Sequence, residues 1–114
     1  MEPDTLDRRL FLRRLLLGAL YGTGAAVACR AGPATHTVTI DSTRFQPAEL
    51  RLSAGDTVVW VNKDLFPHTA TAAGRFDSGS IATDGSWQHT VIERGAIDYV
   101  CTFHPTMKGT LRVE

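Results

Sequence analysis

Short runs of alternating apolar and polar side chains, separated by turn residues, fill the chain from residue 36 to its end. A period of two is typical of β-strands with one buried face, and short strands spaced about 8 to 12 residues apart are typical of sandwiches and barrels. The run at residues 57–62 is apolar on both faces, which suits a central strand. The predicted strands cover residues 36–41, 49–53, 57–62, 68–72, 86–93, 96–101 and 110–114. The pattern therefore predicts an all-β domain.

Length and charge limit the kinds of protein that this chain can be. It has 114 residues, which is enough for one domain. From Arg30 onward there are 8 Lys and Arg against 9 Asp and Glu, so the net charge of this part is near −1. A nucleic-acid-binding protein would show a basic patch or stripe, and none is visible. We therefore expect no nucleic-acid partner and only mild electrostatic steering of a partner protein.

Residues 1–28 have the pattern of a cleavable export signal. Four arginines lie within the first 14 residues, and the following 14 residues, 15–28, are mostly apolar. That stretch is too short for a membrane-spanning helix, which needs about 20 apolar residues. The pair Arg8-Arg9, followed by Phe11-Leu12-Arg13, resembles the twin-arginine motif of the Tat pathway. An ordinary secretory signal rich in arginine is the alternative.

The segment that ends at Cys29 fits two kinds of processing. Ala26-Val27-Ala28 is an Ala-x-Ala cleavage site, which predicts a soluble periplasmic protein. The same residues with Cys29 resemble a lipobox, which predicts a lipid on Cys29 and attachment to the membrane. We favour the lipoprotein, with residues 29–35 as a tether, because Cys29 would otherwise be an idle thiol in an oxidising compartment. A disulfide between Cys29 and Cys101 is disfavoured, because Cys29 lies at the edge of the targeting segment and Cys101 lies in the cluster of candidate metal ligands described next.

Cys101, His104 and Met107 recur at steps of three near the C-terminus. A thiolate, an imidazole and a thioether are soft or borderline metal ligands, and with a second imidazole they suit copper. His68, which follows Pro67, is the candidate for that second imidazole. Zinc is the alternative metal, although zinc sites rarely use methionine. In the alternative without a metal, the cysteine is buried, the histidine lies on the surface, the methionine belongs to the core, and their regular spacing is a coincidence.

Several segments of the chain resemble the cupredoxins, most closely the plastocyanin/amicyanin group. They are Ala54-Gly55-Asp56-Thr57-Val58-Val59-Trp60-Val61-Asn62, Pro67-His68-Thr69, Phe76-Asp77-Ser78-Gly79, Gly95 with Tyr99, and Cys101-x-x-His104-Pro105-x-Met107-Lys108-Gly109. The spacing from the cysteine to the next histidine matches the short ligand loop of amicyanin. The resemblance implies a two-sheet Greek-key β-sandwich over residues 36–114, with one type 1 (blue) copper ion bound by His68, Cys101, His104 and Met107. It also implies a hydrogen bond from Asn62 to the ligand loop near Thr102, which would hold the ligands in place.

Apolar residues flank both predicted histidine ligands. Phe66 and Pro67 precede His68, and Phe103 and Pro105 lie on either side of His104. We expect these four residues to form an exposed patch through which electrons pass to a partner, with Lys63, Asp64 and Lys108 at its rim. Phe103 stands where amicyanin has proline, so the partner of amicyanin is not carried over.

The predicted function is one-electron transfer between periplasmic or membrane-bound redox partners, by a monomer that cycles Cu(I) and Cu(II). The alternative is a periplasmic protein for copper storage or delivery. No nucleophile with an adjacent base is visible, and four protein ligands leave no open position for a substrate, so we expect no enzymatic activity.

The two remaining histidines of the domain are not predicted ligands. His36 is expected to be exposed. His89 shares a face with Trp87 and is expected to be packed, with a hydrogen-bond partner, and not to bind the metal.

Overall fold

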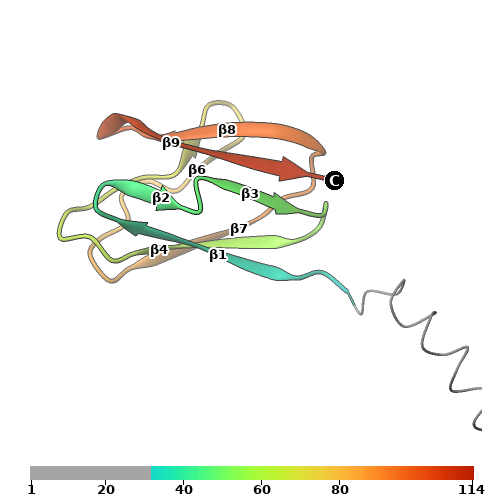
Figure 1. The fold of residues 1–114 in the computed structure, drawn as a ribbon, viewed down its shortest axis with the longest axis horizontal. Coiled ribbons are helices and arrows are strands. Elements are labelled where there is room, and N and C mark those ends of the chain that lie inside the picture. The colour runs from blue at the N-terminus through green and yellow to red at the C-terminus, as the bar shows by residue number, and fades with distance from the viewer. Residues whose placement is uncertain (1–31) are drawn as a thin grey trace, which may run out of the picture. The chain divides into compact units, whose positions relative to one another are not determined.

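A computed structural model describes residues 32–114, and a compact unit covers Pro33–Glu114. The predicted export signal, the proposed lipid site at Cys29 and the first part of the tether lie outside the described residues. Every regular element between residues 32 and 114 is a β-strand, and this region contains no helix that could cross a membrane. The strands form two sheets that face each other, with β1 and β4 in one layer and β8 and β9 in the other (Figure 1). The predicted β-sandwich is confirmed.

The first sheet has the strand order β2-β1-β4-β7. Its strands are β1 (Thr35–Asp41), β2 (Arg44–Gln46), β4 (Thr57–Asn62) and β7 (Ser86–Thr90). β1 runs parallel to β4, with Thr35 opposite Thr57 and Ile40 opposite Asn62. As predicted, β4 is central, lying between β1 and β7. Because β1 and β4 are parallel, they end together at one pole of the sandwich.

The second sheet has the strand order β3-β9-β8-β5-β6. Its strands are β3 (Glu49–Leu52), β5 (Thr71–Ala72), β6 (Phe76–Asp77), β8 (Gly95–Cys101) and β9 (His104–Val113). β8 and β9 form a long antiparallel hairpin that runs from Gly95 opposite Val113 to Cys101 opposite His104. This differs from the prediction that the last strand begins at residue 110. The chain reverses within Thr102 and Phe103, so His104 already pairs with Cys101 and is the first residue of β9.

Alternating side chains of both sheets meet in one core that is rich in aromatic rings. Trp60 of β4 and Tyr99 of β8 are fully buried, with ring centroids 5.5 Å apart in an edge-to-face arrangement. Phe45 of β2 also packs on Tyr99, with ring centroids 4.6 Å apart, and Trp87 is half-buried against Trp60. Burial raises the pKa of Tyr99 to about 12, so its phenol remains neutral at physiological pH. The core therefore joins the sheets directly beneath the end of β8.

Gly109 of β9 lies against this core, opposite Tyr99 in the hairpin. A Cβ atom at this position would lie 2.3 Å from Cζ of Tyr99, whose ring is buried and has no room to retreat. We therefore expect Gly109→Ala to lower the free energy of unfolding by about 1–3 kcal/mol, measured by urea denaturation. Lys108→Ala, at the exposed neighbouring position, should change it by less than about 0.5 kcal/mol. An unchanged denaturation midpoint for Gly109→Ala would contradict this account of the packing.

Candidate metal centre

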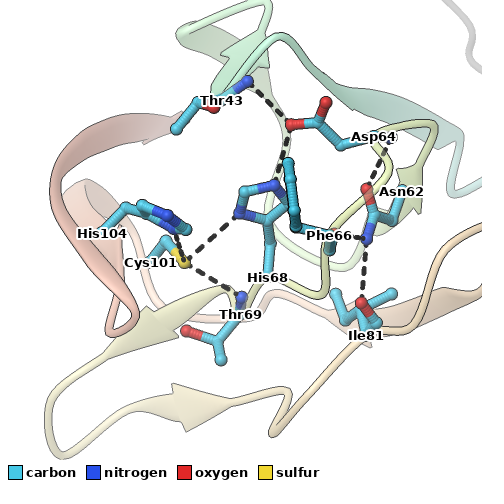
Figure 2. Close-up of polar contacts among 9 residues, drawn as sticks. All are labelled: Thr43, Asn62, Asp64, Phe66, His68, Thr69, Ile81, Cys101 and His104. Atoms are coloured by element: carbon cyan, nitrogen blue, oxygen red, sulfur yellow. Dashed lines mark hydrogen bonds and ion pairs between the residues drawn. The ribbon is translucent and has the colours of Figure 1, made fainter.

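The structure brings together three side chains that the sequence singled out as metal ligands. One ligand atom from each of His68, Cys101 and His104 lies within 4.8 Å of the other two. The sulfur of Cys101 is 3.7 Å from Nδ1 of His68 and 3.9 Å from Nδ1 of His104. Figure 2 shows both imidazole rings turned towards this sulfur. Cys101 is a free thiol.

The β8–β9 hairpin positions two of these side chains. Cys101 is the last residue of β8 and His104 the first of β9, and the two pair across a turn made only of Thr102 and Phe103. The register of the hairpin shifts between Val100 and Cys101, which marks a local irregularity next to the ligand. A spacing of three residues between the cysteine and the histidine thus places both at the closed end of a hairpin.

His68 reaches the site from the first long connection between the sheets. It forms an isolated bridge with Ile81, with its N–H donating to the Ile81 carbonyl at 3.2 Å and its carbonyl accepting from the Ile81 N–H at 2.7 Å. Its side chain and that of Cys101 are fully buried, whereas His104 reaches the solvent. Met107 is also buried and follows His104 by three residues on β9. Of the four predicted ligands, His104 is the one that is exposed.

Asp64 orients the ring of His68, a role that the sequence did not reveal. Its Oδ2 atom lies 2.8 Å from Nε2 of His68, on the opposite edge of the ring from Cys101 (Figure 2). The same carboxylate accepts a hydrogen bond from the backbone N–H of Thr43, and this bond is the main reason that the pKa of Asp64 is lowered. An ionised carboxylate can only accept, so Nε2 of His68 carries the hydrogen and Nδ1 keeps its lone pair for a metal.

Asn62 does not make the hydrogen bond that the resemblance implied. Its amide nitrogen donates to the carbonyl oxygens of Phe66 and Ile81, at 2.8 and 2.9 Å, and its Oδ1 accepts from the N–H of Asp64 at 2.8 Å. Both amide hydrogens are therefore in use, and none is left for the turn at Thr102. The predicted contact is wrong because Asn62 instead fixes the loop that carries Asp64 and leads into His68.

The donor set can be tested against copper by its chemistry and spacing. Two imidazole nitrogens and one thiolate, with a thioether nearby, are the ligands typical of a blue-copper site. At bond lengths usual for nitrogen and sulfur on a first-row metal ion, ligands 120° apart around one ion are about 3.7 Å from each other. The observed separations of 3.7 and 3.9 Å agree with this value. The residues present therefore fit a copper ion.

The apolar residues around the histidines lie on the surface. Phe66 is 62% exposed and Phe103 is 52% exposed, and Pro67 and Pro105 are also exposed. Leu65, which we did not predict, is 82% exposed beside Phe66 and is the most exposed large apolar residue among those described. Asp64, which was expected at the rim of this patch, is half-buried, and its carboxylate lies 2.8 Å from Nε2 of His68.

His89 and His36 lie outside the site, and for each the structure differs in one respect from the prediction made from the sequence. The His89 ring stacks flat on Trp87, with ring centroids 5.6 Å apart, and the side chain makes no hydrogen bond with any of the described residues. Burial lowers its pKa, so the ring is neutral at pH 7. His36 was expected to be exposed. It is instead half-buried in β1, with Nε2 2.9 Å from Oδ2 of Asp56.

Residues 34–114 match the family of copper-binding proteins described as plastocyanin/azurin. This is most of the chain and includes every residue of the site. The chain belongs to the plastocyanin/azurin family. Copper is thus the metal of this family member, in agreement with its donor set.

Solved and curated relatives place the chain more closely among these cupredoxins. It is 33% identical to amicyanin-alpha of Methylorubrum extorquens over 107 residues, which cover 84% of this chain and 87% of that protein. An oxidized amicyanin variant of known structure is 30% identical, with a TM-score of 0.65, over 69% of this chain and 81% of that one. A copper-containing nitrite reductase from Thermus scotoductus is 28% identical, with a TM-score of 0.66, over 70% of this chain but only 22% of its own. The reductase thus shares one domain with this cupredoxin, and its reaction is not carried over.

Replacing Asp64 with alanine removes the carboxylate that orients His68, while the backbone N–H of residue 64 still bonds to Asn62. We expect Asp64→Ala to weaken copper binding by about 10- to 100-fold, measured by competition with a chelator of known affinity. Asp98→Ala is the matched control, because Asp98 is exposed on β8 and, among the described residues, its carboxylate accepts a hydrogen bond only from Thr110, at 2.8 Å. Equal affinities in the two variants would show that the carboxylate at position 64 does not support the site.

Proposed function

We propose that this cupredoxin is a blue copper electron carrier whose metal ligands are His68, Cys101, His104 and Met107. The observation that carries this proposal is a buried cysteine sulfur lying 3.7 and 3.9 Å from Nδ1 of two histidines. Met107 is assigned as the weak fourth ligand because it is buried and follows His104 at the spacing of the short ligand loop. Copper bound by these residues would supply a one-electron Cu(I)/Cu(II) couple.

The residues around the site keep the ligands in place when the charge changes. Asp64 and the bridge to Ile81 hold His68, and the hairpin pairing holds Cys101 against His104. Burial of Cys101 and His68 keeps water away from the thiolate. Ligands that are fixed in one arrangement move little on electron transfer, so a rigid and dry site favours a carrier. The four ligands also leave no open position for a substrate, and we propose no enzymatic activity.

The electron leaves through His104, the one ligand that reaches the surface. Phe66, Pro67, Phe103 and Pro105, with Leu65, form an exposed apolar patch around the two histidines, to which a redox partner protein docks. Apolar patches of this kind on soluble proteins mark binding surfaces. A docked partner would exclude water above His104 and shorten the path for the electron.

The same proposal places the protein outside the cytoplasm. Its support is the sequence of residues 1–29, with a basic start, a short apolar stretch and a lipobox-like end. We propose a periplasmic monomer held to the membrane by a lipid on Cys29. No feature of residues 32–114 favours copper storage or delivery, the alternative that the sequence raised.

Copper reconstitution tests the proposed ligand set directly. We expect the processed protein loaded with Cu(II) to show the intense visible absorption of a thiolate bound to copper, and Cys101→Ser to lose it completely, because a hydroxyl does not replace the thiolate. Thr102→Ser, a similarly small change at the adjacent residue, leaves the thiolate in place and should retain the band. The absence of the band in the wild-type protein would refute the proposed function.

Phe103→Glu tests the apolar patch. A charge introduced into this surface should slow electron self-exchange between oxidised and reduced copies by about tenfold or more. A tenfold change corresponds to roughly 1.4 kcal/mol in the free energy of forming the complex between the two copies. The visible spectrum should stay nearly unchanged, because Phe103 is exposed and is not a proposed ligand. Self-exchange can be measured by NMR line broadening in mixtures of the two oxidation states.

The matched control for this variant is Ile92→Glu. Ile92 is 77% exposed and lies just beyond β7, near the start of β4 and so at the pole away from the site. Ile92→Glu also replaces an exposed apolar residue with an acidic one, and we expect it to leave the rate of electron self-exchange unchanged. If Phe103→Glu also exchanged electrons at the wild-type rate, the patch would not be the port.

A further inference from the structure

A cavity of about 300 Å³ opens on the flank of the sandwich. β7 is an edge strand of the first sheet and β6 an edge strand of the second, and both contribute to its lining, together with β8 and the residues that follow β7. None of the four proposed copper ligands lines this cavity, and neither does any residue of the apolar patch around the histidines. The cavity is therefore separate from the site already described.

We propose that this flank cavity binds a small neutral phenol, with the ring against its apolar wall and the hydroxyl on the imidazole of His89. The inference goes beyond the proposed function and does not rest on it. Three buried side chains, Phe76, Val91 and Ile97, form the apolar wall. A dry cavity of roughly 150 Å³ is enough to hold benzene, so this cavity has room for one aromatic ring with a short substituent.

His89 gives the cavity one polar wall that is held in place and has unused hydrogen-bonding capacity. Its ring stacks on Trp87 with an interplanar angle of 6°, and its centroid lies 5.0 Å from that of Phe76, so two aromatic neighbours fix its plane. The side chain has no hydrogen-bond partner among residues 32–114. Because burial lowers the pKa of His89, the ring is neutral at pH 7 and offers one N–H and one lone pair. A hydroxyl can bond to either nitrogen.

The charges around the cavity favour a neutral ligand. Arg75 and Glu93 are the charged residues of its lining, and their side chains pair with each other at 3.1 Å. Arg75 lies just before β6 and Glu93 just after β7, so the pair joins the two edges between which the cavity lies. The guanidinium and the carboxylate neutralise each other, and neither is left over for a ligand of opposite charge. An anion or a cation would therefore gain nothing over a neutral molecule here.

Phenol and toluene have nearly the same size, and the comparison between them isolates the role of His89. The hydrophobic effect alone favours toluene, because its methyl group is apolar and the hydroxyl of phenol must give up water on burial. A site with a polar group placed for the hydroxyl reverses this order, since that group stays unpaired when the hydroxyl is missing. A preference for phenol over toluene therefore reports a hydrogen bond inside the cavity.

Titration of the processed, reduced protein with phenol and then with toluene tests the proposal, followed by the amide chemical shifts in NMR spectra. We expect saturable shifts with phenol that are concentrated at the residues lining the cavity, in the turn before β6 and at the end of β7. The dissociation constant should lie in the millimolar range that is usual for a ligand with so few atoms. Phenol should bind more tightly than toluene.

His89→Phe keeps a ring that can stack on Trp87 but removes both nitrogens. It should weaken the binding of phenol by about 3- to 10-fold, the loss expected for one hydrogen bond, without weakening that of toluene. His89→Leu repeats the test if the phenylalanine variant does not fold. Gln88→Leu is the matched control, because Gln88 is the exposed neighbour of His89 on β7 and does not line the cavity. It should leave both affinities unchanged.

Three outcomes would overturn the proposal. The first is the absence of saturable shifts with phenol at the lining residues. The second is toluene binding to the wild-type protein as tightly as phenol, which would make the cavity a merely apolar one. The third is an unchanged affinity for phenol in both His89→Phe and His89→Leu. If the wild-type protein lacked the thiolate-to-copper band, the proposed function would fail, and the titrations would still decide the binding of phenol.

Discussion

The pairing of Cys101 with His104 at the closed end of the β8–β9 hairpin is the constraint on which the site depends. A hairpin that turns in two residues leaves its last pair with little freedom, so the thiol and one imidazole are set by backbone geometry before any metal binds. The buried rings of Trp60 and Tyr99 hold the hairpin on the opposite sheet. The core thus gives the metal centre a rigid base, although no core ring is a ligand.

The two histidines are supported in different ways, and this difference separates their roles. His68 is fully buried and hydrogen-bonded to Asp64, which is held in turn by Thr43 from the β1–β2 connection. His104 reaches the solvent among exposed apolar residues. One imidazole is therefore fixed from outside the hairpin, and the other is left accessible. A centre built in this way has a single side at which electrons can be exchanged.

Alternation and spacing predicted an all-β domain, the central strand at residues 57–62 and the segments that carry the candidate ligands, because these are local signals. The two-sheet sandwich was predicted from the resemblance to cupredoxins. The start of β9 was missed, since His104-Pro105-Thr106 shows no alternation and proline is rare in strands. Asn62 was also misplaced, and Asp64 was overlooked as the partner of His68. Those contacts depend on how a loop folds back on itself, and no periodic pattern records the direction of a side chain in a loop.

The parallel pairing of β1 with β4 has a consequence for how the molecule meets its surroundings. The described domain begins beside Thr57, whereas His68 and Asp64 follow the far end of β4. A strand of this length extends roughly 20 Å, so the metal pole and the start of β1 lie at opposite ends of the described domain, and a partner docked at the metal pole leaves the start of β1 uncovered.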